Sequence, residues 1–271
     1  MIEEFVKAVL AEDVGRGDLY ALVEPSCEAE AKIIAKSDGV LAGVYYVDVL
    51  AHLEGLHVEW KKSDGDEFDK GETLAIINGS SHALLRCERT ILNMVLHASS
   101  IATLTSKYVK LIKPYGTKLL DTRKTRPLLR NFEKYATRTG GAINHRMGLD
   151  DCLMLKDTHL KTIDNLQSYI KMARTKIPFT CKIEVEAESF EMALEAMRAG
   201  ADIVMCDNMA PELMQEVVEY KKAHYPHILL EASGNISLET IEAYAATGID
   251  AISSGSLIHQ ANWIDLSMKL Q

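Results

Sequence analysis

Short apolar runs alternate with amphipathic stretches through the second half of the chain. Six runs have the length and composition of buried strands: Lys118–Asp121, Cys152–Lys156, Thr180–Glu186, Asp202–Asp207, Ile228–Ala232 and Asp250–Ser253. Between them, helical patterns with cap-like starts and glycine ends occur at Ile163–Thr175, Ser189–Ala199, Pro211–His224 and Leu238–Thr247. This alternation predicts parallel βαβ units, built either as a barrel or as a doubly wound sheet.

Polar residues decide between these two folds, because they follow nearly every predicted strand. They are Asp121 to Lys124, Lys156 with Asp157, Glu184 with Glu186, Asp207 with Asn208, Glu231 with Ser233, and Ser254 with Gly255. A doubly wound sheet usually concentrates its ligand at one switch point, whereas a barrel builds its site from the carboxyl ends of many strands. The sequence therefore predicts an α/β protein with a TIM-like barrel.

The first hundred residues have a different pattern. A helix is predicted at Ile2–Glu12, strands at Ala29–Lys36 and Thr73–Asn78, and a long helix at Leu84–Leu111 that leads into the barrel. We expect a smaller α/β domain over residues 1–100, against which residues 258–271 can pack, and the barrel over residues 101–257.

Composition excludes several classes of protein. The five cysteines are widely spaced and form no C-x-x-C pair, which indicates reduced thiols rather than disulfides or zinc ligands. The acidic, amphipathic start does not resemble a signal peptide, and no apolar run approaches the ~18 residues of a membrane span. These features predict a cytoplasmic protein with no membrane partner.

Charge is unevenly distributed along the chain. The formal net charge is −9, yet residues 121–146 hold seven Lys and Arg against two acids, a local +5, and the remainder carries −14. A compact basic segment in an acidic protein suggests the capture of a small anion, and the balance elsewhere argues against a nucleic-acid partner. The alternative is a solvated helix face, since Arg126, Arg130, Lys134 and Arg138 are four residues apart.

Two small-residue turns follow the last two predicted strands. Their backbone N–H groups can bind a phosphate, as late loops of barrels commonly do. The residues are Ser233, Gly234, Asn235, Ser254, Gly255 and Ser256. Glu186 and Asp207 end neighbouring strands, where two acids beside a phosphate suit a Mg²⁺ ion shared with the substrate. Ordinary turns and structural ion pairs are the alternatives.

Cations end other strands of the predicted barrel. Arg123 and Lys124 follow the first strand, His145 and Arg146 precede the second, and Lys156 ends it. Converging groups of this kind suit a dianion such as a planar dicarboxylate. Lys156 on its own would also suit a Schiff-base aldolase.

Several blocks closely resemble quinolinate phosphoribosyltransferases, the carboxylating nicotinate-nucleotide pyrophosphorylases. The blocks are Glu12 to Asp18, Glu88 to Asn93, Ile101 to Thr103, Asp121 to Pro127, Gly140 to Arg146, Leu155 to His159, Cys206 to Met209 and Glu231 to Ile236. The order of the D-T-R-K-T and N-H-R blocks is highly specific, and the likeness covers nearly the whole chain. Asn235, Ser256 and Ser100 depart from residues common in the family.

The resemblance implies an N-terminal α/β sandwich domain, an incomplete TIM-like barrel, and a homodimer with shared active sites that can assemble to hexamers. It also implies that the substrates are quinolinate and phosphoribosyl pyrophosphate with Mg²⁺, and that the product is nicotinate mononucleotide for NAD biosynthesis. The implied substrate residues are Arg89 from a neighbouring subunit, Thr122, Arg123, Lys124, His145, Arg146, Lys156, Glu186 and Asp207.

Within this set we expect Lys124, Lys156, Glu186 and Asp207 to be catalytic, with Glu186 and Asp207 as metal ligands. Glu186 or Asp207 would stabilise positive charge on the ribose, and a cation would stabilise the leaving pyrophosphate. Lys124, Lys156 or His145 would protonate the ring after decarboxylation. A related phosphoribosyltransferase acting on another heterocycle carboxylate or a pyrimidine is the main alternative.

Overall fold

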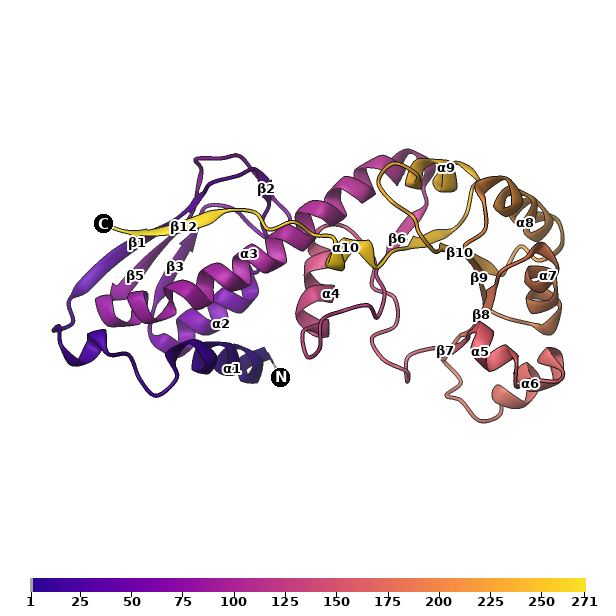
Figure 1. Cartoon of the computed structure of the whole chain (residues 1–271), viewed down its shortest axis with the longest axis horizontal. Coiled ribbons are helices and arrows are strands. Elements are labelled where there is room, and N and C mark those ends of the chain that lie inside the picture. Colours follow the sequence, from indigo (N-terminus) through magenta and orange to yellow (C-terminus); the bar gives the residue numbers. More distant parts are fainter. Residues whose placement is uncertain (1) are drawn as a thin grey trace. The chain divides into compact units, whose positions relative to one another are not determined.

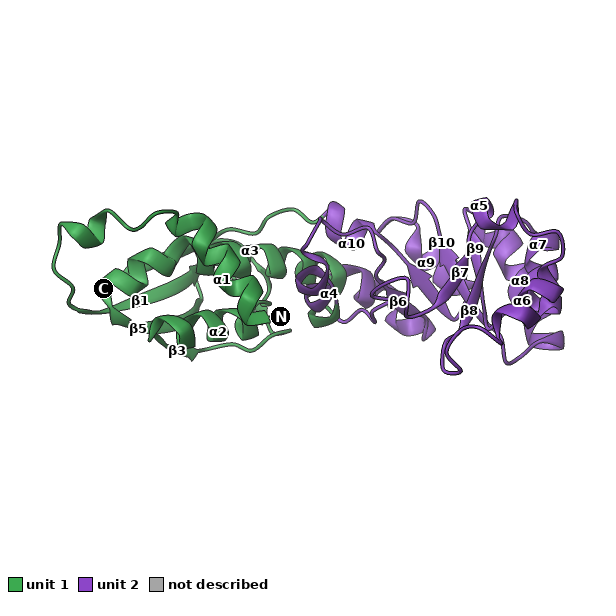
Figure 2. Ribbon diagram, turned by 90° about the horizontal axis from the view of Figure 1, so that it is seen from below, with its two compact units in different colours: residues 1–106, 138–140, 261–271 green, residues 107–137, 141–260 purple. Residues whose placement is uncertain are grey.

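A computed structural model describes residues 2–271, so the first residue of the predicted N-terminal domain lies outside the described part. The chain forms two compact units, which Figure 2 colours separately. One unit comprises residues up to 106 together with 138–140 and 261–271, and the other comprises residues 107–137 and 141–260. Each unit has its own sheet.

The first unit is built on a four-stranded antiparallel sheet in the order β12-β1-β5-β3. Its strands are β1 (Glu28–Ala35), β3 (His57–Trp60), β5 (Thr73–Ser80) and β12 (Leu266–Leu270), with a small separate pair of β2 (Gly39–Val40) and β4 (Glu67–Phe68). Its helices are α1 (Ile2–Val14), the short 3-10 turn η1 (Tyr20–Leu22), α2 (Val44–Glu54) and α3 (Ser81–Ile112), whose last turns belong to the second unit. Helices α2 and α3 run across the sheet in Figure 1.

Alternation along β1 shows why one face of this sheet is covered. Ala31, Ile33 and Ala35 are fully buried, while the residues between them are partly exposed. A period of two places those three side chains on the same face, and removal of their apolar area from water stabilises the packing of helices against the sheet. The sequence predicted α1, α3, β1 and β5 of this unit but not β3 or α2. It also did not specify that the C-terminal segment pairs with β1 as strand β12.

Ser100 is one of the departures noted in the sequence, and it is accommodated within this unit. Its buried hydroxyl donates to the Leu96 carbonyl oxygen (2.6 Å) and accepts from the Ile264 N–H (3.0 Å). A hydroxyl satisfied on both sides carries no desolvation penalty for an unpaired group. The side chain thereby ties the C-terminal segment to α3.

The second unit contains six parallel strands in the order β6-β11-β10-β9-β8-β7. They are β6 (Lys118–Leu120), β7 (Leu153–Leu155), β8 (Ile183–Ala187), β9 (Ile203–Asp207), β10 (Leu229–Ser233) and β11 (Ala251–Ser253). All six match the predicted strands, with ends that differ by up to three residues. No ladder of residues 2–271 joins the edge strands β6 and β7, so the predicted incomplete barrel is confirmed.

Helices follow the strands, and α7, α8 and α9 lie along the outside of the curved sheet (Figure 1). They are α4 (Arg130–Thr139), α5 (Asp157–Leu160), α6 (Leu166–Ala173), α7 (Phe190–Ala199), α8 (Pro211–His224), α9 (Ile241–Ala246) and α10 (Ser256–His259), with the 3-10 turn η2 (Lys113–Tyr115) before β6. In α7, Ser189 caps the start by accepting from the Met192 N–H, and Gly200 ends the helix in a left-handed conformation. These are the start and stop signals by which the sequence predicted this helix.

All five residues of β8 are buried, which is typical of a parallel strand covered on both faces.

The cysteines are all unpaired, and burial raises the pKa of Cys87 and Cys206 to about 12, so these two thiols are unreactive at neutral pH. Within residues 2–271, no helix combines the length and the apolar character that crossing a membrane requires.

Candidate active site

The carboxyl ends of the parallel strands surround a cavity of about 370 Å³. It is lined by Thr122, Arg123, Lys124, His145, Arg146, Met154, Lys156, Glu186, Met205, Asp207, Glu231, Ser233 and Ser253. The predicted substrate residues of the barrel therefore come together in one place, although they are far apart in the sequence. Arg89 is exposed on α3 and does not line this cavity.

Arg123 indicates what the cavity binds. Its Nε atom is buried and has no hydrogen-bond partner among residues 2–271. Burial, together with the charges of Arg146 and Arg130, lowers the pKa of the Arg123 guanidinium, which means that the cations repel one another without a compensating anion. A buried donor of this kind is costly unless an acceptor pairs with it. A carboxylate or phosphate oxygen in the cavity would satisfy both the donor and the charge.

A buried ion pair supports the segment that carries His145 and Arg146. The Lys134 ammonium lies 2.5 Å from Asp121 Oδ1 and donates to the carbonyl oxygens of His145 (2.8 Å) and Arg146 (3.1 Å). Asp121 in turn accepts from the Asn144 side chain (2.5 Å) and the His145 N–H (2.8 Å). Both charges are fully buried and well supplied with partners, as buried ion pairs require. Asp121 and Asn144 thus shape the site and do not line it.

This pair corrects one interpretation of the basic segment. The four-residue spacing suggested a solvated stripe of Arg126, Arg130, Lys134 and Arg138, but α4 begins only at Arg130 and Lys134 is completely buried. Arg126 lies before the helix and pairs with the buried Glu133 (2.6 Å). The four-residue period correctly describes Arg130 and Arg138, which lie on α4 and are at least partly exposed. It could not reveal that Asp121 lies beneath this helix.

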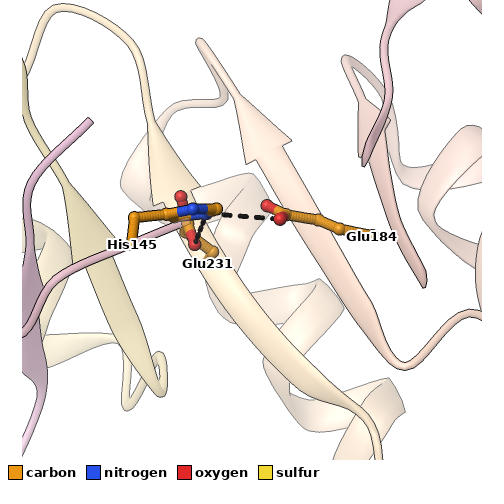
Figure 3. A group of neighbouring side chains, drawn as sticks. All are labelled: His145, Glu184 and Glu231. Carbon is orange, nitrogen blue, oxygen red and sulfur yellow. Dashed lines mark ion pairs between the residues drawn. The ribbon is translucent and has the colours of Figure 1, made fainter. Parts of the chain in front are cut away.

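His145 is held between two acids (Figure 3). Its Nε2 atom lies 3.2 Å from Glu184 Oε2 and 3.3 Å from Glu231 Oε2, and its Nδ1 atom lies 2.7 Å from the Arg146 backbone nitrogen. Burial opposes a charge on His145, but hydrogen bonds to Glu184 and Glu231 outweigh it and raise the pKa to about 10. Burial also opposes a charge on Glu184, and for this acid it raises the pKa.

The contact at Nδ1 shows where the protons of this cluster lie. A proton on Nδ1 would point at the Arg146 N–H only 2.7 Å away, so the geometry favours a single ring proton, on Nε2. The raised pKa of His145 therefore reflects a proton that the cluster of His145, Glu184 and Glu231 retains as a unit.

Glu186 and Asp207 end the neighbouring strands β8 and β9. Their carboxylate oxygens and one from the exposed Glu188 lie within 4.8 Å of one another. Burial raises the pKa of Glu186, while Lys156, whose Nζ is 3.5 Å from Glu186 Oε2, opposes this shift. Hard oxygen donors at this spacing fit Mg²⁺.

A second cavity of about 230 Å³ lies at the two glycine turns. It is lined by Thr122, Lys124, Ser233, Gly234, Asn235, Ile236, Ser237, Ser253, Ser254, Gly255, Ser256, His259 and Gln260. Four of these residues, Thr122, Lys124, Ser233 and Ser253, also line the larger cavity. The two cavities therefore adjoin, and one long substrate can extend across both. His259 and Gln260 were not predicted, because neither lies in a recognisable motif.

The first turn depends on left-handed backbone conformations. Asn235 has φ 52° and Asn208 has φ 54°, and the Asn235 amide donates to Asn208 Oδ1 (3.1 Å). A Cβ added to Gly234 would lie 2.2 Å from that same Asn208 oxygen. Glycine is therefore required for space as well as for its φ of 94°, and Asn235 is tolerated because asparagine adopts the left-handed region readily.

Comparison with known families decides the identity of this site. Residues 18–99 match the quinolinate phosphoribosyl transferase N-terminal domain, and residues 101–269 match its C-terminal domain. The chain belongs to the quinolinate phosphoribosyltransferase family. The likeness proposed from the motifs is thereby confirmed.

Full-length relatives support this family membership. The chain is 38% identical to the nicotinate-nucleotide pyrophosphorylase (carboxylating) of Dictyostelium discoideum, over all of this chain and 96% of the relative. It superimposes on the nicotinate-nucleotide pyrophosphorylase of Francisella tularensis with a TM-score of 0.94 and 34% identity, over all of this chain and 96% of that one. For NadC from Streptococcus pyogenes the TM-score is 0.93 and the identity 40%, with the same coverage.

The predicted enzyme class is confirmed as well. The activity is that of a phosphoribosyltransferase, the carboxylating nicotinate-nucleotide pyrophosphorylase of NAD biosynthesis. This quinolinate phosphoribosyltransferase also has the fold of its family, an N-terminal antiparallel sheet and a C-terminal sheet of six parallel strands.

Proposed function

We propose that the family reaction takes place in the larger cavity, with the 5-phosphate of phosphoribosyl pyrophosphate in the adjoining smaller one. The buried, unpartnered Nε of Arg123 carries this assignment, because it marks a place for an anionic oxygen among cations. Ser233, Gly234 and Asn235 form one side of the phosphate subsite, and Ser254, Gly255 and Ser256 form the other. Their contiguity with Thr122 and Lys124 matches a substrate that carries its phosphate at one end.

Quinolinate is a planar dicarboxylate, and the cations of the larger cavity suit it. Arg123 and Arg146 offer forked donors to the carboxylates, and Lys124 and Lys156 add point charges. Arg89, exposed on α3, would enter the site from a second copy of the chain. This proposal implies a homodimer as the smallest active form, with a hexamer as a larger assembly.

The reaction forms a bond between the quinolinate nitrogen and ribose C1 as the bond from C1 to pyrophosphate breaks. Positive charge develops on the ribose, and Glu186 or Asp207 stabilises it from the strand ends. The ring nitrogen of the intermediate is cationic, and its charge stabilises the electron pair that remains on ring C2 when the 2-carboxylate leaves as CO₂. A proton then has to reach ring C2.

The structure bears on the source of that proton. Lys124, Lys156 and His145 all line the cavity, but both ring nitrogens of His145 contact other groups of the chain. Lys124 and Lys156 are therefore the donors that we propose. Lys156 lies beside Glu186, whose carboxylate can keep the ammonium oriented.

Glu186 and Asp207 would hold Mg²⁺ together with substrate oxygens. Bound there, the ion neutralises charge that builds on the leaving pyrophosphate. Asp207→Asn keeps the size of the side chain but removes one negative charge. We expect the Mg²⁺ concentration for half-maximal activity to rise at least ~10-fold, since a charge-assisted contact contributes about 1.5–3 kcal/mol. Glu191→Gln, an exposed acid on α7, is the control, and an unchanged Mg²⁺ requirement in Asp207→Asn would argue against this metal site.

Arg146→Ala should weaken quinolinate binding at least ~10-fold, through loss of one charged hydrogen bond or more. The Kd of quinolinate, measured by calorimetry on a folded variant, tests this expectation. Unchanged affinity would remove Arg146 from the substrate site.

Turnover with quinolinate, phosphoribosyl pyrophosphate and Mg²⁺, followed by the release of pyrophosphate and of CO₂, tests the function as a whole. Nicotinate in place of quinolinate is the matched comparison, because it lacks the 2-carboxylate that the reaction releases. We expect activity with quinolinate only. Turnover of nicotinate alone would instead identify a relative acting on another heterocycle carboxylate.

A further inference from the structure

The segment that carries Arg146 has little regular structure of its own. It runs from the end of α4 to β7, and an isolated bridge between Ile143 and Leu120 is its one sheet-like contact in the described chain. The Lys134–Asp121 pair fixes the carbonyl groups and one N–H of this segment. A loop that must hold a charged side chain within a fraction of an ångström needs further support.

His145 supplies the second support, and it acts through both of its ring nitrogens. Nδ1 accepts from the Arg146 N–H at 2.7 Å, which requires a lone pair on Nδ1 and places the ring proton on Nε2. Nε2 then donates toward Glu184 (3.2 Å) and Glu231 (3.3 Å). The ring is therefore oriented from one side by β8 and β10 and orients the Arg146 backbone on the other.

Burial of the two acids is costly. Their side chains are buried, and the Oε1 atom of each has no hydrogen-bond partner among residues 2–271. Barrel interiors are usually filled with branched apolar residues, and a buried acid with an unsatisfied oxygen is less stable than an apolar replacement of similar volume. Proteins retain destabilising buried groups of this kind mainly where the groups serve the function.

The guanidinium of Arg146 is anchored as well. Nη1 donates to the Cys152 carbonyl oxygen (3.0 Å) and Nη2 lies 3.4 Å from Met154 Sδ, both at β7. With the backbone held by His145 and the side chain held at β7, the position of the Arg146 guanidinium in the cavity depends on both supports. The orientation of the His145 ring therefore bears directly on how well quinolinate is held.

We propose that Glu184 and Glu231 are positioning residues for quinolinate binding, which act by fixing the His145 ring so that its Nδ1 holds the Arg146 backbone in place. His145 thus contributes to the substrate site by orienting Arg146. The arginines and lysines of the cavity, and not His145, bind the carboxylates of quinolinate. This inference rests on the proposed function, since it concerns the quinolinate side of the same cavity.

Substitution of each acid by leucine and by glutamine tests the proposal. Leucine removes one of the two acceptors for Nε2–H and leaves the ring held by a single acid, whereas the glutamine carbonyl retains that acceptor. We expect Glu231→Leu and Glu184→Leu to raise KM for quinolinate at least ~10-fold, with KM for phosphoribosyl pyrophosphate within ~2-fold of wild type. Glu231→Gln and Glu184→Gln should bring KM for quinolinate back to within ~3-fold of wild type.

Val185→Ala is the matched control. Val185 lies between Glu184 and Glu186 in the sequence of β8 and is fully buried. Because side chains alternate along a strand, it points to the face opposite that of the two acids. It should leave KM for quinolinate within ~2-fold of wild type although it opens a cavity in the core. Leucine variants that change both KM values equally, or no more than Val185→Ala does, would show a merely structural role and overturn the proposal.

A measurement on the unaltered protein covers the case in which the leucine variants do not fold. Nitrogen-15 NMR of the His145 imidazole should show a protonated Nε2 and an unprotonated Nδ1. A proton on Nδ1 would contradict the bond from Arg146 and overturn the proposal. If wild-type protein neither binds nor turns over quinolinate, the proposed function itself fails, whereas normal wild-type turnover with unaffected leucine variants refutes only this inference.

Discussion

Lys134→Met should reduce the free energy of unfolding by about 3–5 kcal/mol, the cost of leaving one partner of a buried ion pair uncompensated. Methionine fills much of the same volume, so the loss arises from Asp121, which stays buried without its counter-ion. The carbonyl groups of His145 and Arg146 lose their donor as well. Urea-induced unfolding followed by circular dichroism measures the change.

Two further variants separate this effect from a general effect of substitution on α4. Arg138→Met on the same helix alters an exposed side chain and should change the free energy of unfolding by less than about 0.5 kcal/mol. Asp121→Asn combined with Lys134→Met removes both charges and should be more stable than Lys134→Met alone. A Lys134→Met protein as stable as wild type would show that the ion pair contributes nothing to the fold.

Arg123→Met should weaken quinolinate binding by about 10- to 100-fold, because a charged hydrogen bond contributes about 1.5–3 kcal/mol and Arg123 supplies a buried donor that no group of residues 2–271 pairs. Arg123→Lys retains the charge but lacks the Nε donor and the forked geometry. It should therefore lose at least ~10-fold as well. The Kd of quinolinate, measured by calorimetry, tests both variants.

Stability provides the discriminating control for Arg123. Removal of an unpaired buried donor from a group of mutually repelling cations should leave the Tm of the ligand-free protein unchanged or slightly higher. Lys171→Ala, an exposed cation on α6, should alter neither affinity nor Tm. Full quinolinate affinity in Arg123→Met, or a large fall in its Tm, would show that Arg123 serves the fold and not the ligand.

Much of the barrel was predictable because local rules govern it. The six parallel strands and helices such as α7 followed from apolar runs, capping residues and glycine stops, which act over a few residues. In the first unit the same rules missed β3 and α2. His57–Trp60 is exposed or partly exposed at the edge of its sheet, and α2 carries aromatic and β-branched residues that are weak helix formers.

The sequence by itself determined the family, the barrel and the chemical character of the site. Each of the signals that carry them, the apolar runs, the D-T-R-K-T and N-H-R motifs and the two glycine turns, is a continuous stretch of the chain. The tertiary structure alone revealed that Lys134 is buried on Asp121, that Glu184 and Glu231 enclose His145, and that a buried donor of Arg123 has no partner in the described part of the chain. The physical reason is that pairing between buried charges depends on which side chains meet across separate strands and helices. Spacing along one element carries no information about a partner on another.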